Sequence, residues 1–208
     1  MNLSRRLLVL AGLFTALMVI GARLKIPFPI VPLTLQPFFV LLSGLFLGPV
    51  YGAASQIAYV FLGLIGFPVF SEGGGLAYVL KPSFGYLIGF PFASFIAGLI
   101  VHRRLHPSGF LPAVTLTRLL FANFAALFTI FLPGVFYLWL NFNFMLQQPL
   151  SLTHAIYLGF LRFVPGDLIK IAGVTLLYRA LQPRLAVLFT PVAQAPNERT
   201  AETIMAEK

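Results

Sequence analysis

Long apolar runs, separated by short polar clusters, dominate the pattern of hydrophobic and polar positions along the chain. No Asp, Glu, Lys or Arg occurs between Ile26 and Ser71, or again between Leu119 and Leu161. Each run could hold two membrane spans of about 20 residues. Segments such as FFVLLSGLFLG lack the period-2 alternation of barrel strands, so the pattern favours membrane helices.

The apolar runs predict six spanning helices, and hence an all-α, polytopic six-helix bundle. Gly48-Pro49 predicts a tight break between the second and third helices. Residues Ser151 to Phe163 are interpreted either as a further short helix or as an early part of the last span. The predicted spans are Leu7–Leu24, Leu35–Leu47, Val50–Leu64, Ser83–Val101, Leu111–Leu132 with an optional extension to Leu140, and Pro165–Leu181.

Two connections differ from ordinary short turns. Pro27, Pro29 and Pro32 predict an extended, proline-stiffened loop after the first helix, which can act as a lid. The segment from Ile65 to Pro82, IGFPVFSEGGGLAYVLKP, follows the third helix and is too Gly-rich for a helix and long for a connector. Both connections are therefore expected to be functional loops.

The composition supports a membrane-embedded chain, because 59% of residues are hydrophobic and 9% are charged, against about 25% charged in soluble domains. A net charge of +9 would suggest nucleic acid as a partner of a soluble protein. Here the basic residues lie singly or in pairs between apolar runs, so they predict membrane topology and no nucleic-acid partner. The chain has no cysteine, which excludes disulfides and thiolate nucleophiles.

The distribution of basic residues predicts which side of the membrane each loop occupies. Six basic residues fall on the side of the termini, and three on the other: Arg5, Arg6, Arg103, Arg104, Arg179 and Arg184 against Arg23, Lys25 and Lys81. This bias predicts cytoplasmic termini and external long loops after the first and third helices. We interpret the N-terminal apolar segment as a retained first helix, residues 1–190 as the membrane domain, and 191–208 as a polar, disordered cytoplasmic tail.

The segment FVPGDLIKI contains the only aspartate of the chain, Asp167, followed by Lys170. An intramembrane carboxylate is by default a candidate functional group. A purely structural interpretation remains, because Asp167 lies near a helix N-terminus and Lys170, three residues on, could neutralise it. Buried ion pairs stabilise poorly compared with apolar packing, so we favour a binding site for a small amphiphilic ligand with N–H donors and a carboxylate.

Enzymatic interpretations have little support, and we expect neither a metal nor a cofactor. His102, His106 and His154 are scattered, and the sequence has no HExxH, GxSxG or Walker motif. The protein is therefore predicted not to be an enzyme. If ATP drives transport, another protein must hydrolyse it.

Other polar and small residues have two interpretations each. Gln36, where the proline-rich loop meets the second helix, could bond a ligand or the loop backbone. Gly12 and Ala16 form a small-xxx-small face, which could contact either a partner helix or a helix of the same bundle. Three residues are interpreted as interhelical hydrogen-bonding groups: Gln56, Tyr59 and Asn123.

Several segments together resemble BioY, the biotin-specific substrate-binding (S) component family of energy-coupling-factor (ECF) transporters. The resemblance covers the chain from Ile20 to about Ile171. Its motifs are IGARLKIPFPIVPLTLQPF, LLSGLFLGPVYGAASQIAYVFLGLIGFPVF, the GGG loop followed by PSFGYLIGF, and FVPGDLIKI.

The resemblance implies a six-helix bundle in a prokaryotic-type plasma membrane, in contact with lipids, with an outward-facing biotin site. It implies ligand contacts for six residues: Asp167, Lys170, Gln36, Gly74, Ser83 and Tyr86. It also implies docking of the first helix, through Gly12 and Ala16, to a T component that works with two ATPase subunits. An S component for another vitamin, or a small intramembrane enzyme, is the alternative, and a homo-oligomer is left open.

The chain departs from the family pattern at KPSFGY, where the family reads close to GPTGGY. Lys81 and Phe84 replace glycines, and Ser83 replaces threonine. Lys81 could provide a second cation for the ligand carboxylate. We favour a charge on the outer surface, because loop lysines are usually solvated.

Overall fold

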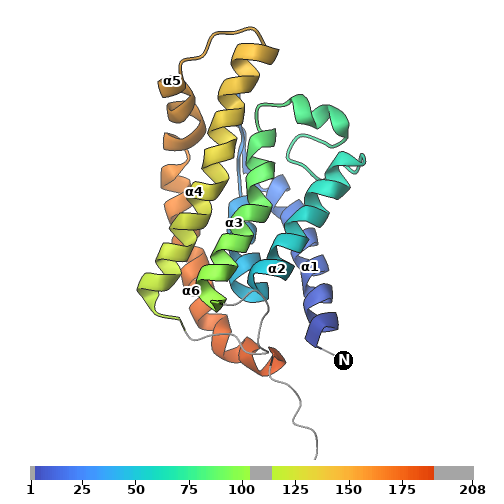
Figure 1. Ribbon diagram of the computed structural model, residues 1–208, viewed down its shortest axis with the longest axis vertical. Coiled ribbons are helices and arrows are strands. Elements are labelled where there is room, and N and C mark those ends of the chain that lie inside the picture. The colour runs from blue at the N-terminus through green and yellow to red at the C-terminus, as the bar shows by residue number, and fades with distance from the viewer. Residues whose placement is uncertain (1–2, 104–113, 190–208) are drawn as a thin grey trace, which may run out of the picture.

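The computed structural model describes residues 3–103 and 114–189. Helices make up most of this part of the chain and follow the long axis of the molecule (Figure 1). The elements in chain order are α1 (Leu3–Arg23), β1 (Lys25–Ile26), β2 (Leu33–Thr34), α2 (Gln36–Leu64), the 3-10 helix η1 (Leu76–Leu80), α3 (Phe84–His102), α4 (Leu116–Leu140), the π-helical η2 (Asn141–Met145), α5 (Leu152–Ile156), the π-helical η3 (Tyr157–Leu161) and α6 (Val164–Phe189).

The element α2 is a pair of arms, residues 36–47 and 49–64, that fold back on each other at Gly48. Gly48 has φ 76° and ψ −179°, a conformation open essentially to glycine alone. The Gln56 amide in the second arm donates to the Ser43 hydroxyl in the first arm at 2.9 Å, a contact that a straight helix would not allow. This geometry confirms the break predicted at Gly48-Pro49.

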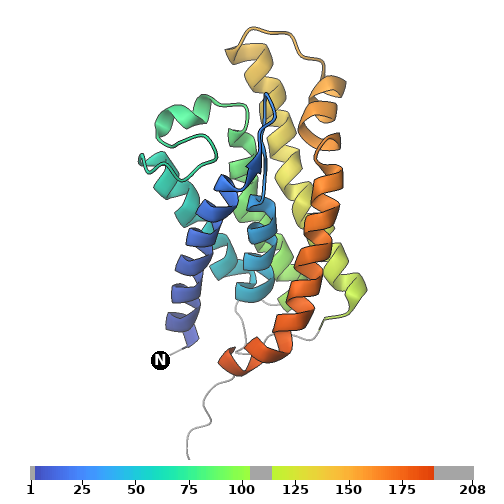
Figure 2. The ribbon, with the colours of Figure 1, turned by 180° about the vertical axis from the view of Figure 1, so that it is seen from behind.

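The proline-rich connection folds into a short antiparallel hairpin rather than an unpaired loop. Lys25 pairs with Thr34, and Ile26 pairs with Leu33. Figure 2 shows this hairpin along the upper part of the bundle, between α1 and α6. It contacts α6 directly, since a Cβ on Gly166 would lie 3.1 Å from a Leu33 methyl carbon. Two-residue strands carry no detectable alternation, which is why the sequence pattern did not predict them.

The connection between α2 and α3 was predicted to be too Gly-rich for a helix, and this expectation is wrong for its second half. Residues Leu76–Leu80, after the three glycines, form the 3-10 helix η1. Tyr78 anchors this turn by packing against Phe70, with ring centroids 4.6 Å apart. Burial of one aromatic side chain therefore orders a segment that glycine content alone predicts to be irregular.

Several helix limits differ from the predicted spans. Helix α4 begins at Leu116, where the Thr115 hydroxyl accepts the Arg118 amide, and it continues through Pro133 to Leu140. The predicted start at Leu111 and the predicted tail at 191–208 lie outside the described residues. Helix α6 runs to Phe189, eight residues beyond the predicted end at Leu181. Capping and tertiary packing set these limits, and neither is visible in hydropathy.

Four described helices are long and apolar enough to cross a membrane: Arg5–Arg23, Gln36–Leu64, Phe84–His102 and Leu116–Met145. Helix α6 carries Asp167 and Lys170 but presents Ile169 and Leu176 outward, 75% and 71% exposed. Large apolar side chains also point outward from α4, among them Phe121 and Phe128. Such an apolar exterior suits lipid rather than water.

Candidate functional site

A cavity lies where the β1–β2 hairpin and the loop 65–82 meet α3, α4 and α6. Its lining combines apolar and aromatic walls with a small set of polar side chains, which is the usual character of a small-molecule site. The aromatic walls include Phe70, Phe90, Phe131 and Phe163. The polar lining residues are Thr34, Gln36, Ser71, Tyr78, Ser83, Tyr86, Asp167 and Lys170.

The ion pair between Asp167 and Lys170 is the strongest electrostatic feature of this cavity. Their side chains lie 2.7 Å apart, and the two residues are 3% and 8% exposed. Helix α6 begins at Val164, with Pro165 as its second residue, so Asp167 lies in the first turn, where the helix dipole favours an anion. Within the described residues, this contact uses one of three ammonium donors and one carboxylate oxygen. The pair therefore keeps both donors and acceptors for a ligand.

Gln36 lines the cavity and also belongs to a hydrogen-bond chain that joins four segments. Its Nε2 donates to the Tyr59 hydroxyl at 2.8 Å, and its Oε1 accepts from the Thr34 hydroxyl at 3.0 Å. Tyr59 in turn donates to the Val69 carbonyl at 2.9 Å. The side chain thus links the hairpin, both arms of α2 and the loop 65–82. The structure supports its loop-bonding role and leaves a ligand contact as a prediction.

Tyr86 and Ser83 both lie on the cavity at the start of α3. The Tyr86 hydroxyl donates to the Gly159 carbonyl at 2.7 Å, which fixes α3 to η3. Its ring also contacts Phe131 and Phe163 edge-on, at centroid distances of 6.1 and 6.5 Å. The proton of Tyr86 is already used, so this residue offers a ligand mainly its ring and an acceptor oxygen.

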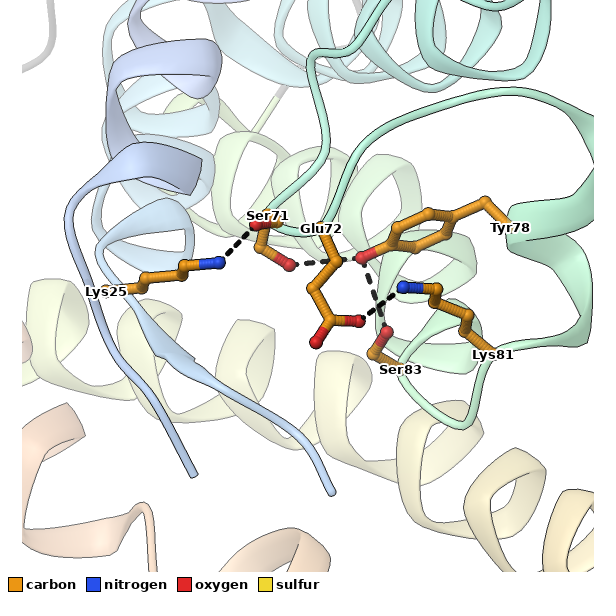
Figure 3. Close-up of polar contacts among 6 residues, drawn as sticks. All are labelled: Lys25, Ser71, Glu72, Tyr78, Lys81 and Ser83. Carbon is orange, nitrogen blue, oxygen red and sulfur yellow. Dashed lines mark hydrogen bonds and ion pairs between the residues drawn. The ribbon is translucent and has the colours of Figure 1, made fainter. Parts of the chain in front are cut away.

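Ser83 belongs to a group of three buried hydroxyls, which we call the hydroxyl cluster: Ser71, Tyr78 and Ser83. The Ser71 and Tyr78 oxygens are 3.0 Å apart, and Ser83 donates to Tyr78 over a longer 3.4 Å (Figure 3). All three residues line the cavity and are less than 10% exposed. The cluster joins the loop 65–82 to α3.

Gly74 and Lys81 lie outside the cavity lining. A Cβ on Gly74 would be 2.0 Å from the Phe67 carbonyl oxygen, so this glycine permits close backbone packing in the loop. Lys81 forms a half-exposed ion pair with Glu72 at 2.9 Å (Figure 3). This placement supports the outer-surface interpretation of Lys81 rather than a second cation inside the cavity.

Two basic residues, one at the end of α1 and one at the start of β1, fasten the hairpin side of the molecule to the loop 65–82. Arg23 donates to the Pro68 carbonyl, and Lys25 donates to the Ser71 carbonyl at 2.5 Å. Both bonds end on backbone oxygens. One of the two bonds therefore ends on Ser71, which lines the cavity.

The sequence analysis missed Ser71 and Tyr78, and it missed the phenylalanines of the aromatic walls. With 23 phenylalanines in the chain, no local pattern distinguishes the four that line the cavity. Ser71 and Tyr78 flank the GGG segment, and their position beside a predicted functional loop was the available signal.

Gly12 and Ala16 lie away from this cavity, on an outward face of α1. A Cβ on Gly12 would have no other atom within 4 Å, and both residues are exposed. Four large apolar residues are exposed around them: Leu8, Val9, Leu13 and Ile20. The face is therefore not used for packing within the described bundle, which favours the partner interpretation over the intramolecular one.

The known proteins to which this chain is similar are all named for the transport of biotin. The probable biotin transporter BioY of Lysinibacillus sphaericus is 41% identical over 160 residues, which cover 77% of this chain and 78% of the relative. The biotin transporter BioY of Thermotoga maritima is 39% identical over 173 residues, covering 83% and 93%. A crystal structure of the S component for biotin from an ECF-type ABC transporter matches with a TM-score of 0.72 and 27% identity, over 86% of this chain and 92% of that chain.

The match to the BioY family itself extends over residues 1–187, and so takes in the hairpin, the loop 65–82 and the ion pair of α6. It confirms the resemblance inferred from the sequence motifs. This chain is a multi-pass membrane protein that belongs to the BioY family.

Proposed function

We propose that this chain binds biotin and mediates its uptake as the S component of an ECF-type transporter. The observation that carries the proposal is the buried Asp167–Lys170 pair at an aromatic-walled cavity, in a chain whose relatives are named biotin transporters. The protein works by binding rather than by catalysis. Gln36, Ser83 and Tyr86 contribute further contacts, and Gly74 shapes the covering loop.

The chemistry of biotin fits the charges of the cavity. Its ureido ring is neutral, with two N–H donors and one carbonyl acceptor. A carboxylate accepts from the N–H groups, and an ammonium donates to the carbonyl, so a neutral ion pair complements both functions at once. An ionised carboxylate at the same place would add a second anion beside Asp167, which a buried site disfavours. We therefore orient the ureido ring toward Asp167 and Lys170.

The apolar part of biotin has matching walls. Its thiophane ring and valerate chain require desolvated surroundings, which Phe70, Phe131 and Phe163 provide. Closure of the hairpin and the loop 65–82 over the ligand would exclude water and strengthen the polar contacts.

We propose that transport requires a T component and two ATPase subunits, because the sequence has no Walker motif of its own. The outward α1 face around Gly12 and Ala16 is the proposed contact with the T component. Small residues let two helices approach closely, so that backbone and side chains pack well in lipid.

For the membrane arrangement, we propose six crossings with both termini cytoplasmic in a prokaryotic-type plasma membrane. The two arms of α2 count as the second and third crossings. The first arm, 36–47, is about 18 Å long at the α-helical rise, short of the roughly 30 Å of hydrocarbon. The strand β2 would complete this crossing, and non-helical backbone is tolerated at depth where it lines a cavity.

Basic residues support this orientation. Arg103 follows α3, which ends at the same end of the molecule as the start of α1 (Figure 1), whereas Arg23 ends α1, Lys25 begins the hairpin and Lys81 belongs to the loop 65–82. In this arrangement, the hairpin and the loop 65–82 are extracellular. Residues 1–190 form the membrane domain, and 191–208 form a cytoplasmic tail.

The proposal is tested by calorimetric titration of biotin into detergent-purified protein, with thiamine and riboflavin as control ligands. Tight binding of biotin alone is the expected result. Binding of a control vitamin in place of biotin would favour an S component for another vitamin. Silence of all three ligands with folded protein would contradict the proposal.

A further inference from the structure

A groove separate from the candidate site lies on the outside of the bundle, between α4 and the η3–α6 segment. Its lining residues come from the segments 124–131 and 160–171, and we call this hollow the lateral groove. Eight of its nine lining residues in the described chain are apolar, and the ninth is Asp167. One turn beyond Ile171, the Asn123 amide of α4 donates to the Thr175 hydroxyl of α6 at 3.2 Å, so the two helices are in contact next to the groove.

The lateral groove opens on the lipid-facing exterior of the bundle. Phe128 and Leu168 form part of its lining and are 65% and 49% exposed. Helix α4 belongs to the apolar stretch Leu116–Met145, which is long enough to cross a membrane. The groove lies along the middle of that stretch, where the surrounding medium is hydrocarbon rather than water.

The size and chemistry of the groove favour an acyl chain over a polar ligand. Its volume is about 320 Å³, whereas an apolar cavity of roughly 150 Å³ already stays dry and binds a benzene ring. A sugar, peptide or nucleotide would find a single polar partner here, and burying its other polar groups without hydrogen bonds is costly. A chain of methylene groups has no such cost, because it needs only dispersion contacts with apolar walls.

A single layer of side chains separates the lateral groove from the ligand cavity. Phe131 and Asp167 line both hollows. The Phe131 ring packs on Phe160, a groove residue, at a centroid distance of 4.9 Å, and it stacks on Phe163, a cavity residue, at 6.3 Å. The occupant of the groove therefore contacts the back of a wall that faces the ligand.

Asp167 makes the ion pair of α6 sensitive to what fills the groove. Its side chain is buried together with its hydrogen bond to Lys170. Water in the groove would raise the local dielectric constant beside this carboxylate and compete for its lone pairs, which weakens its hydrogen bonds. An acyl chain in the same place keeps water out and preserves these bonds.

We propose that the lateral groove binds one acyl chain of a membrane phospholipid, and that this chain keeps water from the groove side of Asp167. The effect on ligand affinity rests on the proposed biotin-binding function, whereas the lipid site itself does not. The bilayer is then part of the ligand site and not only the medium around the protein.

The first test is native mass spectrometry of the protein released from a mild detergent. The unmodified protein should retain a phospholipid of the expression membrane. Leu168→Trp places an indole in the groove and should lower the retained fraction about threefold or more, because it displaces part of the chain and its packing contacts. Ile169→Trp is the matched control, because Ile169 is 75% exposed on the same helix and does not line the groove.

Three results of this experiment would overturn the lipid site. They are equal phospholipid retention in the two variants, absence of retained phospholipid from the unmodified protein, and a second copy of the chain in place of the lipid.

The second test measures biotin affinity in nanodiscs of phosphatidylethanolamine and phosphatidylglycerol. Phe128→Ser brings a hydroxyl and water to the groove, so biotin should bind about fivefold or more weakly, since hydrogen bonds to charged groups lose strength on hydration. Phe121→Ser is the matched control, because Phe121 is 64% exposed on the same helix and does not line the groove. An equal change of affinity in the two variants, including no change in either, would overturn the effect on the ligand cavity.

Leu168→Trp separates water exclusion from lipid binding. The indole displaces the acyl chain but also keeps water from Asp167, so biotin affinity in nanodiscs should stay within about twofold of that of the unmodified protein. A loss as large as that in Phe128→Ser would overturn water exclusion as the cause. Failure of the unmodified protein to bind biotin would instead overturn the proposed function, and mass spectrometry would still decide the lipid site.

Discussion

Asp167 and Lys170 stabilise each other's charge in surroundings where either charge alone would be unfavourable. Asp167→Asn leaves Lys170 buried without a counter-charge, and breaking one partner of a buried pair costs about 3–5 kcal/mol. We expect a lower melting temperature and a biotin affinity reduced by about tenfold or more. Thermal unfolding and calorimetry of the same preparation measure both effects.

The combined change Asp167→Leu with Lys170→Met separates stability from binding. Replacing a buried ion pair with apolar side chains is often neutral for stability. This variant should therefore have a melting temperature close to that of the unmodified protein and still fail to bind biotin. Glu72→Gln breaks the exposed pair with Lys81 and should change stability by less than about 1 kcal/mol. If folded Asp167→Asn binds biotin as tightly as the unmodified protein, the Asp167 carboxylate does not contact the ligand.

Gly74 should be essential for the loop even though it does not line the cavity. Gly74→Ala would place a Cβ 2.0 Å from the Phe67 carbonyl oxygen, and such overpacking costs about 1–3 kcal/mol. We expect faster protease cleavage within residues 65–82 and weaker biotin binding. Gly12→Ala is the control, because its Cβ meets no atom within 4 Å. Equal protease resistance of both variants would contradict this role.

At the level of single residues, the sequence predicts some members of the site and misses others. Asp167 and Lys170 could be found because charges are rare in an apolar run. Tyr78 and Ser71 resemble many other residues of the chain, and only the folding of the loop onto α3 brings them to Ser83. Their role depends on contacts between segments, which periodicity does not encode.

Helix α2 depends on one backbone conformation at Gly48. Gly48→Ala forces a side chain into a positive-φ conformation that costs about 1–3 kcal/mol, so we expect a lower melting temperature. The facing Gly98 also packs closely on this turn, because a Cβ on Gly98 would lie 2.5 Å from the Gly48 carbonyl carbon. Gly12→Ala again serves as the control. An unaltered melting temperature for Gly48→Ala would mean that the turn can be rebuilt without glycine.

Predictability of the elements follows the strength of their local signals. A Gly-Pro pair inside an apolar run is a strong local signal for a chain break, and the turn of α2 lies at the predicted Gly48-Pro49 position. The β1–β2 hairpin has no such signal, because its pairing spans only two residues per strand. Helix α6 continues beyond its apolar stretch to Phe189. Hydropathy did not predict this limit, because it does not detect where backbone hydrogen bonding ends.

For the whole molecule, the outward face of α1 predicts a separation of ligand binding from assembly. Gly12→Leu fills the small-residue face with a branched side chain, so docking to the T component and its ATPase subunits should be impaired. Biotin affinity should remain unchanged, because this face is remote from the cavity lining. Co-purification with the transport module measures docking, and calorimetry measures binding.

The control for that prediction is a small-to-large change on another outward face. Ala172 is exposed on α6, so Ala172→Leu should leave co-purification unchanged. Normal assembly of Gly12→Leu, or equal loss in both variants, would show that the α1 face has no specific role. The sequence alone left this face open between two interpretations, because small residues also pack within bundles.

The short first arm of α2 has a consequence for how the chain is made. A 12-residue apolar segment such as 36–47 is too short to be retained in the bilayer as an independent helix. We therefore expect it to enter together with the second arm, with Gly48 reversing the direction of the chain. On this expectation the hairpin of α2, rather than each arm, is the unit that the insertion machinery delivers into the membrane.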